Sequence, residues 1–251
     1  MNSIQGKSAV IIGASSGVGR ATVKALISEG AHVVAVARGR EALDALRAEA
    51  AEPIQTVQAD AADPTTAQCL LLEFRPELVV LAAGVRPRMG ALDEQSWETF
   101  SEPWNVDTQA AFYLLKAALT MPLAPGSTVV VVSSGAAIDG SPLSGGYAGA
   151  KRMQWLLADY AQKLSDKKKL GLRFLAVVPH QLIEGTDIGN AAAAAYGALR
   201  GMSGADFIKR NWKVPLNVDK VSVAIVSGLR GDIAQGVTAI EVTDQGVEPL
   251  E

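Results

Sequence analysis

Seven short apolar runs, rich in valine and isoleucine, are separated along the chain by longer segments with amphipathic helical spacing. The runs do not alternate with polar residues, which is typical of strands buried on both faces. Strands that alternate with helices favour a parallel sheet, and right-handed crossovers place helices on both of its faces. The sequence therefore predicts a doubly wound α/β fold of three layers around a mostly parallel, seven-stranded sheet. The expected strands are residues 9–12, 33–37, 54–57, 78–81, 128–132, 174–178 and 237–242.

The chain of 251 residues shows no linker, internal repeat or compositional break, so we expect one domain over residues 1–251. One segment, 183–215, departs from the alternating pattern because it is rich in glycine and alanine and carries Tyr196, Phe207 and Trp212. It falls between the last two strands, at the carboxyl end of the sheet, where open sheets bind ligands. We interpret it as a helical lid over the substrate. The alternative is a surface helical pair that packs against a neighbouring subunit.

Charge and composition exclude several classes of function. The net charge is −3, from 23 basic and 26 acidic residues, which gives no reason to expect nucleic acid or an anionic membrane as a partner. The single cysteine, Cys69, and two histidines make a metal site unexpected, and the apolar neighbours of Cys69 predict a buried thiol. No signal-peptide layout and no apolar stretch of about 18 residues is present, so we expect a cytoplasmic protein.

A glycine-rich turn follows the first strand directly. Glycines at positions 13, 17 and 19 allow a tight turn and a close approach of the backbone to a pyrophosphate. The helix that follows directs its free N–H groups and positive dipole end at such an anion. The alternative is a turn that only connects strand and helix. The candidate cofactor-binding residues here are Gly13, Ser15, Ser16, Gly17, Val18 and Gly19.

The spacing G-x-x-x-G-x-G of this turn differs from the usual dinucleotide fingerprint. It resembles the glycine motif of the short-chain dehydrogenase/reductase family, and the resemblance extends over nearly the whole chain. It implies a Rossmann domain of about 250 residues that binds a nicotinamide dinucleotide. It also implies a homo-oligomer, either a dimer or a tetramer.

Arg38 indicates which nicotinamide dinucleotide is bound. Sites selective for NAD place an acid at the end of the second strand, where this chain has Ala37 followed by Arg38. An arginine there can clamp a 2′-phosphate through charge-assisted hydrogen bonds, and Arg40 is a possible helper. We therefore predict NADP(H) in preference to NAD(H). The alternative is that Arg38 only starts the next helix and stacks on adenine.

Tyr147 and Lys151 are the candidate catalytic pair. Four residues apart on a predicted helix, they share one face, and a nearby cation lowers the pKa of a phenol toward neutrality. Such a phenol exchanges a proton with a substrate oxygen. Ser134 ends a central strand thirteen residues earlier, and Asn105 precedes a helix. The alternatives are a turn hydroxyl for Ser134 and a helix cap for Asn105.

These four residues resemble the Asn-Ser-Tyr-Lys set of the same family, in the same order. The resemblance implies that Tyr147 is the general acid or base and that Ser134 polarises the substrate carbonyl. Lys151 then binds the nicotinamide ribose, and Asn105 holds a water molecule. The resemblance further implies cofactor contacts from Asp60, Ala61, Ala83, Gly84, Pro179 and Thr186.

The predicted reaction moves a hydride between the nicotinamide and a carbonyl or alcohol carbon of a small organic substrate. The alternative is a catalytically silent NADP(H)-binding regulatory protein. The family usually has glycine where this chain has His180, and we interpret that histidine as structural or substrate-shaping rather than catalytic.

Overall fold

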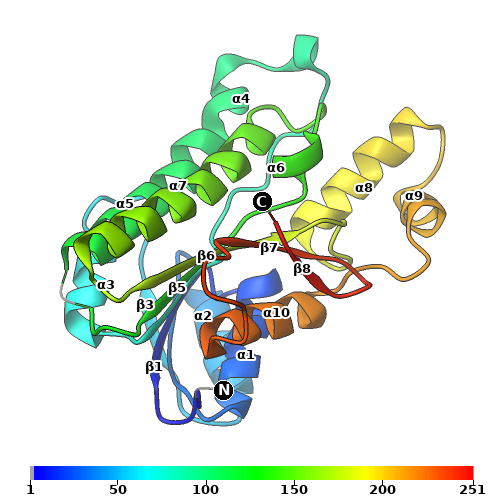
Figure 1. Cartoon of the computed structure of the whole chain (residues 1–251). Coiled ribbons are helices and arrows are strands. Elements are labelled where there is room, and N and C mark those ends of the chain that lie inside the picture. Colours follow the sequence, from blue (N-terminus) through cyan, green and yellow to red (C-terminus); the bar gives the residue numbers. More distant parts are fainter. Residues whose placement is uncertain (1–2, 122, 251) are drawn as a thin grey trace.

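The computed structural model describes residues 3–121 and 123–250 (Figure 1). Its centre is one eight-stranded sheet in the order β3-β2-β1-β4-β5-β6-β7-β8. All neighbouring strands are parallel except β7 and β8. The strands are β1 (Ser8–Ile12), β2 (His32–Ala37), β3 (Gln55–Gln58), β4 (Leu78–Leu81), β5 (Thr128–Val132), β6 (Arg173–Pro179), β7 (Ala239–Val242) and β8 (Val247–Pro249).

The predicted fold class is confirmed, with one correction to the number of strands. All seven predicted strands form, and β8 is an eighth that pairs antiparallel with β7 at the sheet edge. Its three residues are exposed and include Glu248 and Pro249, so it lacks the apolar run that marks a buried strand. The sequence pattern gave no signal for such a short edge strand.

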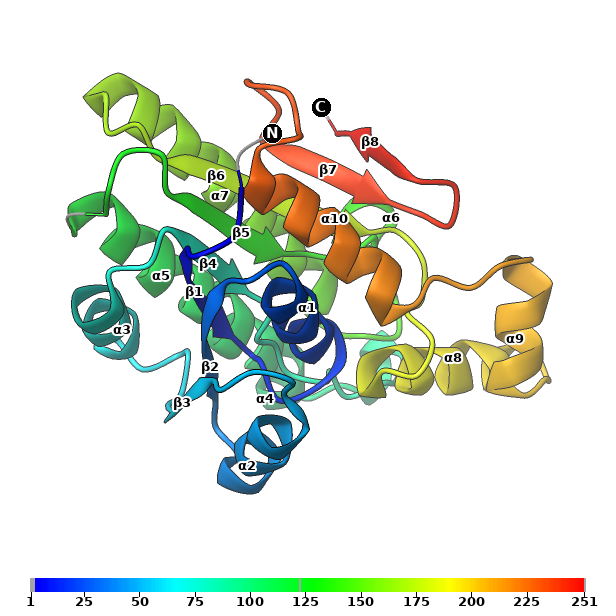
Figure 2. The same cartoon turned by 90° about the horizontal axis from the view of Figure 1, so that it is seen from below.

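Helices cover both faces of the sheet, as Figures 1 and 2 show. Residues from α1, α2 and α10 enter one hydrophobic core, and residues from α3, α5 and α7 enter another on the opposite face. The helices are α1 (Gly17–Ser28), α2 (Arg40–Glu49), α3 (Thr66–Phe74), α4 (Trp97–Pro103), α5 (Gln109–Thr120), α6 (Ala136–Asp139), α7 (Tyr147–Lys168), α8 (Asp187–Leu199), α9 (Gly204–Asn211) and α10 (Val218–Arg230), with a 3-10 turn at Leu92–Glu94 and a π-helical turn at Trp104–Thr108.

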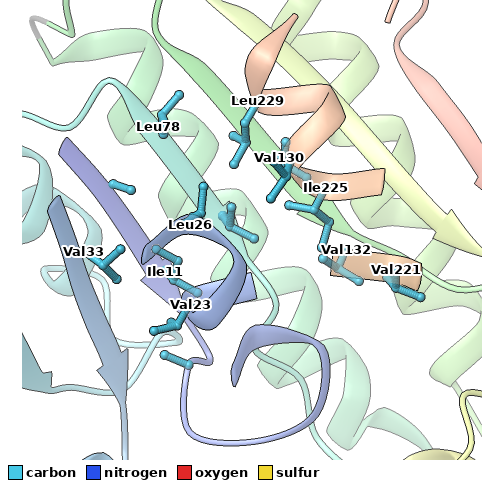
Figure 3. Close-up of a cluster of buried hydrophobic side chains, with 14 of the residues drawn as sticks. Ile11, Val23, Leu26, Val33, Leu78, Val130, Val132, Val221, Ile225 and Leu229 are labelled. Carbon is cyan, nitrogen blue, oxygen red and sulfur yellow. The ribbon is translucent and has the colours of Figure 1, made fainter. Parts of the chain in front are cut away.

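Alternate residues of each central strand enter opposite cores. Ala9 and Ile11 of β1 pack on the α1 and α10 side, whereas Val10 and Ile12 pack on the α3 and α5 side. Figure 3 shows the first of these cores, where Leu26 and Ile225 meet residues of the sheet such as Val130. Because both faces are buried, the strands need apolar residues at every position, which explains the unbroken runs in the sequence.

The course of the sheet locates the ligand site. Strands β1, β2 and β3 follow one another toward one edge of the sheet, and the chain then returns to place β4 on the other side of β1. The winding of the sheet therefore reverses between β1 and β4. A crevice at the carboxyl ends of the strands is expected at such a reversal. Helices α8 and α9 pack on each other and extend beyond this end of the sheet (Figures 1 and 2).

The position of Cys69 on α3 corrects one prediction. Cys69 is exposed, so the prediction of a buried thiol is wrong. Helix α3 buries Thr66, Ala67, Leu70 and Leu71, and helical periodicity leaves position 69 on the solvent side.

Among the described helices, none combines the length and apolar character that crossing a bilayer requires.

Candidate active site

A continuous cavity of about 930 Å³ lies at the carboxyl ends of the strands. Residues that directly follow β1, β2, β3, β4, β5 and β6 line it, and the α8–α9 segment lines its outer side. The cavity therefore occupies the crevice at which the winding of the sheet reverses. With two exceptions, Gly19 and Asn105, every candidate site residue predicted from the sequence lines this cavity.

The glycine turn has the shape of a pyrophosphate cradle. At Gly13, φ is +91° and a Cβ would lie 2.4 Å from the backbone nitrogen of Ala83, so only glycine fits. Gly17 also has a positive φ, +51°. Gly19 does not line the cavity; a Cβ there would lie 2.1 Å from the carbonyl oxygen of Gly13, so its role is the close packing of α1 on the turn.

The first turn of α1 leaves its N–H groups available to a ligand. Ser16, the N-cap residue, makes no side-chain capping hydrogen bond, and the first turn holds no acidic residue. Ser15, Ser16, Gly17 and Val18 all line the cavity. Uncapped N–H groups at a helix N-terminus, beside a backbone that only glycine permits, fit the phosphates of a dinucleotide.

Arg38 and Asp60 line the part of the cavity beyond β2 and β3. Ala37 is the last residue of β2, and the exposed Arg38 precedes α2, which begins at Arg40. The Arg38 side chain takes part in none of the ion pairs that the described residues form. Asp60 accepts a hydrogen bond from the backbone of Ala62 at 3.0 Å, and Ala61 also lines the cavity. Arg40 does not line it.

Tyr147 and Ser134 meet on the inner wall of the cavity. Tyr147 is the first residue of α7 and is buried, while Ser134 follows β5 and is half-buried. Burial raises the pKa of the Tyr147 phenol, the Lys151 charge lowers it, the Asp107 charge raises it, and the nearby Ser134 hydroxyl lowers it. The net pKa lies above the ordinary value. The lowering effect expected from Lys151 is thus outweighed by burial and Asp107.

Lys151 belongs to a buried polar cluster. Its Nζ lies 3.0 Å from Oδ2 of Asp107 and donates to Oε1 of Gln154 at 3.0 Å. Ser133 donates a hydrogen bond to the Lys151 carbonyl oxygen at 2.8 Å, which ties α7 to the end of β5. Burial lowers the pKa of Lys151, but Asp107 and Tyr147 outweigh that effect and raise it, so the ammonium stays charged.

The structure does not bring Asn105 into the cavity, so that expectation requires correction. Asn105 is exposed, and its Nδ2 donates to Oγ of Ser101 at 3.5 Å. The residue beside Lys151 is Asp107, two positions further along the π-helical turn Trp104–Thr108. The residue type and the order of the four residues, from which Asn105 was predicted, do not specify which side chain of this π-helical turn faces Lys151.

The remaining candidate residues line other parts of the cavity. Ala83 and Gly84 follow β4, and Pro179 ends β6 and accepts a hydrogen bond from the backbone of Gly135 at 2.6 Å. Thr186 caps α8 by accepting from the Gly189 backbone at 3.0 Å. Its methyl carbon would lie 3.6 Å from a Cβ at Gly17, so Thr186 faces the glycine turn. In the part of the chain that the structure describes, no group of acidic, histidine or cysteine residues could hold a metal ion.

His180 lies on the cavity wall between two carboxylates. Its Nε2 is 2.7 Å from Asp139 of α6, and its Nδ1 is hydrogen-bonded to Glu241 of β7. Burial lowers the pKa of His180, but the hydrogen bonds and charges of the two carboxylates outweigh it and raise the pKa. Both ring nitrogens are therefore engaged in connecting α6, β6 and β7, in line with a structural role.

Replacing His180 by glutamine is expected to lower the free energy of unfolding more at about pH 6 than at about pH 9. The difference between the two losses is about 1 kcal/mol, as for a partly exposed ion pair. The pKa of His180 is higher in the folded protein than in the unfolded chain, where it is about 6.5. The charged histidine therefore stabilises the fold fully below about pH 6.5, and this stabilisation is lost as the pH rises through the folded pKa. Urea unfolding of both proteins across this range measures it. A stability difference that grows with pH would contradict the account.

A family model described as short chain dehydrogenase matches residues 7–195. This stretch holds the glycine turn, Ser134, Tyr147 and Lys151 and covers most of the chain. The chain therefore belongs to the short-chain dehydrogenase/reductase family, a family of oxidoreductases.

Particular relatives carry names consistent with that family. The chain is 28% identical over 186 residues to 2,5-dichloro-2,5-cyclohexadiene-1,4-diol dehydrogenase of Sphingobium indicum, covering 71% of this chain and 74% of that protein. It is 35% identical over 131 residues to L-xylulose reductase of Mesocricetus auratus, covering 52% and 53%. Its fold is similar to that of levodione reductase, with a TM-score of 0.82, 21% identity and 95% of both chains covered. It is also similar in fold to NAD+-bound xylitol dehydrogenase, with a TM-score of 0.81, 18% identity and coverage of 91% and 94%.

Proposed function

We propose that this protein is an NADP(H)-dependent oxidoreductase that transfers a hydride between the nicotinamide and the carbonyl or alcohol carbon of a small organic substrate. The observation that carries the proposal is one cavity that joins an uncapped helix N-terminus and glycine turn to the buried Tyr147, Ser134 and Lys151. The first set fits the phosphates of a dinucleotide, and the second fits proton exchange with a substrate oxygen.

When bound, the dinucleotide supplies the hydride chemistry, and the protein supplies position and protons. Gly13, Ser15, Ser16, Gly17 and Val18 hold the phosphates, and Ala83 and Gly84 let the adenosine half approach the end of β4. Ser134 donates a hydrogen bond to the substrate oxygen, and Tyr147 gives that oxygen its proton in the direction of reduction. Lys151, fixed by Asp107 and Gln154, binds the ribose hydroxyls of the nicotinamide half.

Helices α8 and α9 form the lid in this proposal. Thr186, Tyr196 and Phe207 of this segment line the cavity, and the ring of Tyr196 stacks on that of Phe207 with centroids 6.0 Å apart. A wall of largely apolar side chains over the site excludes water from the reacting atoms. The pair packs mainly on itself, which suits an element that moves relative to the sheet.

Replacing Arg38 by alanine is expected to weaken NADP(H) binding about tenfold or more while leaving NAD(H) binding within about twofold. The reason is that a charged hydrogen bond to the 2′-phosphate contributes about 1.5–3 kcal/mol and NAD(H) has no such phosphate. Arg40→Ala is the matched control because Arg40 does not line the cavity. Fluorescence titration with both reduced dinucleotides measures the affinities. Equal losses for the two would contradict the assignment of Arg38.

The proposed activity is tested with NADPH deuterated at the reactive ring position and a panel of small ketones and aldehydes. We expect oxidation of NADPH by at least one class and recovery of the deuterium on the former carbonyl carbon. Tight NADPH binding without turnover on any carbonyl, or on alcohols with NADP+, would instead favour the silent binding protein.

A further inference from the structure

Asp107 is a fully buried carboxylate beside the candidate catalytic pair. It has no exposed surface, its Oδ1 accepts a hydrogen bond from the Val85 backbone at 2.8 Å, and its Oδ2 lies 3.0 Å from Nζ of Lys151. Gly84 leaves room for it, since a Cβ there would lie 2.9 Å from Oδ2. Because a buried charge is unfavourable unless it is paired, the carboxylate and the ammonium are fixed partners.

A second contact holds the same arrangement. Gln154 accepts from Nζ of Lys151 at 3.0 Å through Oε1 and donates from Nε2 to the Asp107 carbonyl oxygen at 2.9 Å. Lys151 Nζ also lies 5.5 Å from the centre of the Tyr147 ring, so the phenol and the Asp107 carboxylate are both neighbours of one ammonium. Because the carboxylate is charged and lies 3.0 Å from the ammonium, whereas the phenol is neutral, the positive charge of Lys151 is paired with Asp107.

The other elements around Tyr147 add little charge. Ser134, after β5, is neutral, and burial, Lys151, Asp107 and Ser134 are the groups that shift the pKa of the phenol. On the cavity wall, His180 after β6 is engaged by Asp139 of α6 and Glu241 of β7. Arg86, on the segment after β4, is exposed at the rim. The pair formed by Asp107 and Lys151 therefore dominates the charge next to the phenol.

We propose that Asp107 is the resident counter-ion of Lys151 and keeps Tyr147 in its phenol form, the protonation state that carbonyl reduction consumes. The inference rests on the proposed function. In reduction, the substrate carbon receives a hydride from a reduced nicotinamide dinucleotide, whose ring is oxidised. The C=O π bond breaks, and the substrate oxygen takes the proton as the Tyr147 O–H bond breaks. Solvent then returns a proton to the phenolate. Alcohol oxidation needs that phenolate at the start, so it requires alkaline conditions.

The test is an ultraviolet absorbance titration of tyrosinate without cofactor or substrate. The chain has four tyrosines, and subtracting the titration of Tyr147→Phe isolates position 147. We expect the wild-type Tyr147 midpoint at or above the free value of about 10, or a phenol protonated until the protein unfolds. In Asp107→Asn the midpoint falls by about one pH unit or more, because the ammonium is released toward the phenol. Alcohol oxidation extends to lower pH in the same variant.

Two controls separate charge from packing. Glu98→Gln removes an exposed carboxylate from α4 and leaves the midpoint unchanged. Gln154→Leu removes a neutral partner of Lys151 and moves the midpoint less than Asp107→Asn does. Circular dichroism checks that each variant folds. If Asp107→Asn does not fold, the titration midpoint of Tyr147 in the wild-type protein alone tests the inference.

A wild-type midpoint well below about 10, or equal midpoints in wild type and Asp107→Asn, would overturn the inference. Neither result would affect the oxidoreductase proposal, which stands on turnover and deuterium transfer. Conversely, an absence of turnover would refute the proposed function without changing the midpoint of the Tyr147 titration.

Discussion

Replacing Tyr147 by phenylalanine is expected to lower kcat/KM for carbonyl reduction by about 10²–10⁴, the contribution of a positioned acid. The variant loses one hydroxyl and keeps the buried ring, so the fold and the dinucleotide affinity stay near wild type. Steady-state NADPH oxidation gives the rate, and fluorescence titration gives the affinity. The loss appears in kcat as well as in kcat/KM because the proton is transferred in the transition state.

Tyr160→Phe is the matched control for this prediction. Tyr160 lies on the same helix, α7, but is 54% exposed and does not line the cavity. Its loss leaves the rate within about twofold, as for most surface substitutions. A Tyr147→Phe enzyme with nearly wild-type activity would remove Tyr147 from the mechanism and leave Ser134 or a water molecule as the proton donor.

The Gly13→Ala variant is expected to lose dinucleotide binding and much of its stability. A positive φ disfavours alanine by about 1–2 kcal/mol. In addition, a Cβ 2.4 Å from the Ala83 backbone forces the glycine turn away from the end of β4, a packing strain of about 1–3 kcal/mol. Because the displaced turn is the proposed phosphate cradle, binding is lost together with stability. Thermal unfolding and NADPH fluorescence titration measure the two effects.

Gly126→Ala separates backbone strain from the clash. Gly126 has nearly the same φ, +93° against +91° at Gly13, but a Cβ there meets no atom within 4 Å. Gly126→Ala therefore lowers the free energy of unfolding only by the cost of the positive φ, and dinucleotide binding is unchanged. Equal stability losses in the two variants, with binding retained in Gly13→Ala, would contradict the proposed role of the turn.

The fold was predictable from the sequence because burial on both faces of the sheet imposes an unbroken apolar run on each parallel strand. Strand β5 shows this best, since all five of its residues are buried. The pattern fails where that requirement is absent. Strand β8 is exposed and pairs only with β7 in the described sheet, so no buried apolar run marks it. The face on which Cys69 lies depends on the rotation of α3, which the average hydropathy of its neighbours does not specify.

The candidate site was predictable where strand ends or regular helical spacing fix the residues. Tyr147 and Lys151 share a face of α7, and Ser134 follows β5, so topology alone brings them together. Asn105 was predicted from its residue type and its order among the four residues, and neither specifies which side chain of the π-helical turn faces Lys151. A signal did exist: Asp107 is an acid next to the apolar pattern of α5, and Gln154 lies three residues after Lys151 on the same helix. Their ion pair and hydrogen bonds needed the structure.

A crystal structure with bound NADP+ is the decisive experiment for the proposed function, because it locates the reactive ring carbon relative to the Tyr147 hydroxyl. We expect the pyrophosphate on the glycine turn at the start of α1, the 2′-phosphate against Arg38, and the nicotinamide facing Tyr147 and Ser134 across a gap that a small carbonyl fills. A dinucleotide bound elsewhere, or a nicotinamide turned away from the Tyr147 hydroxyl, would contradict the account.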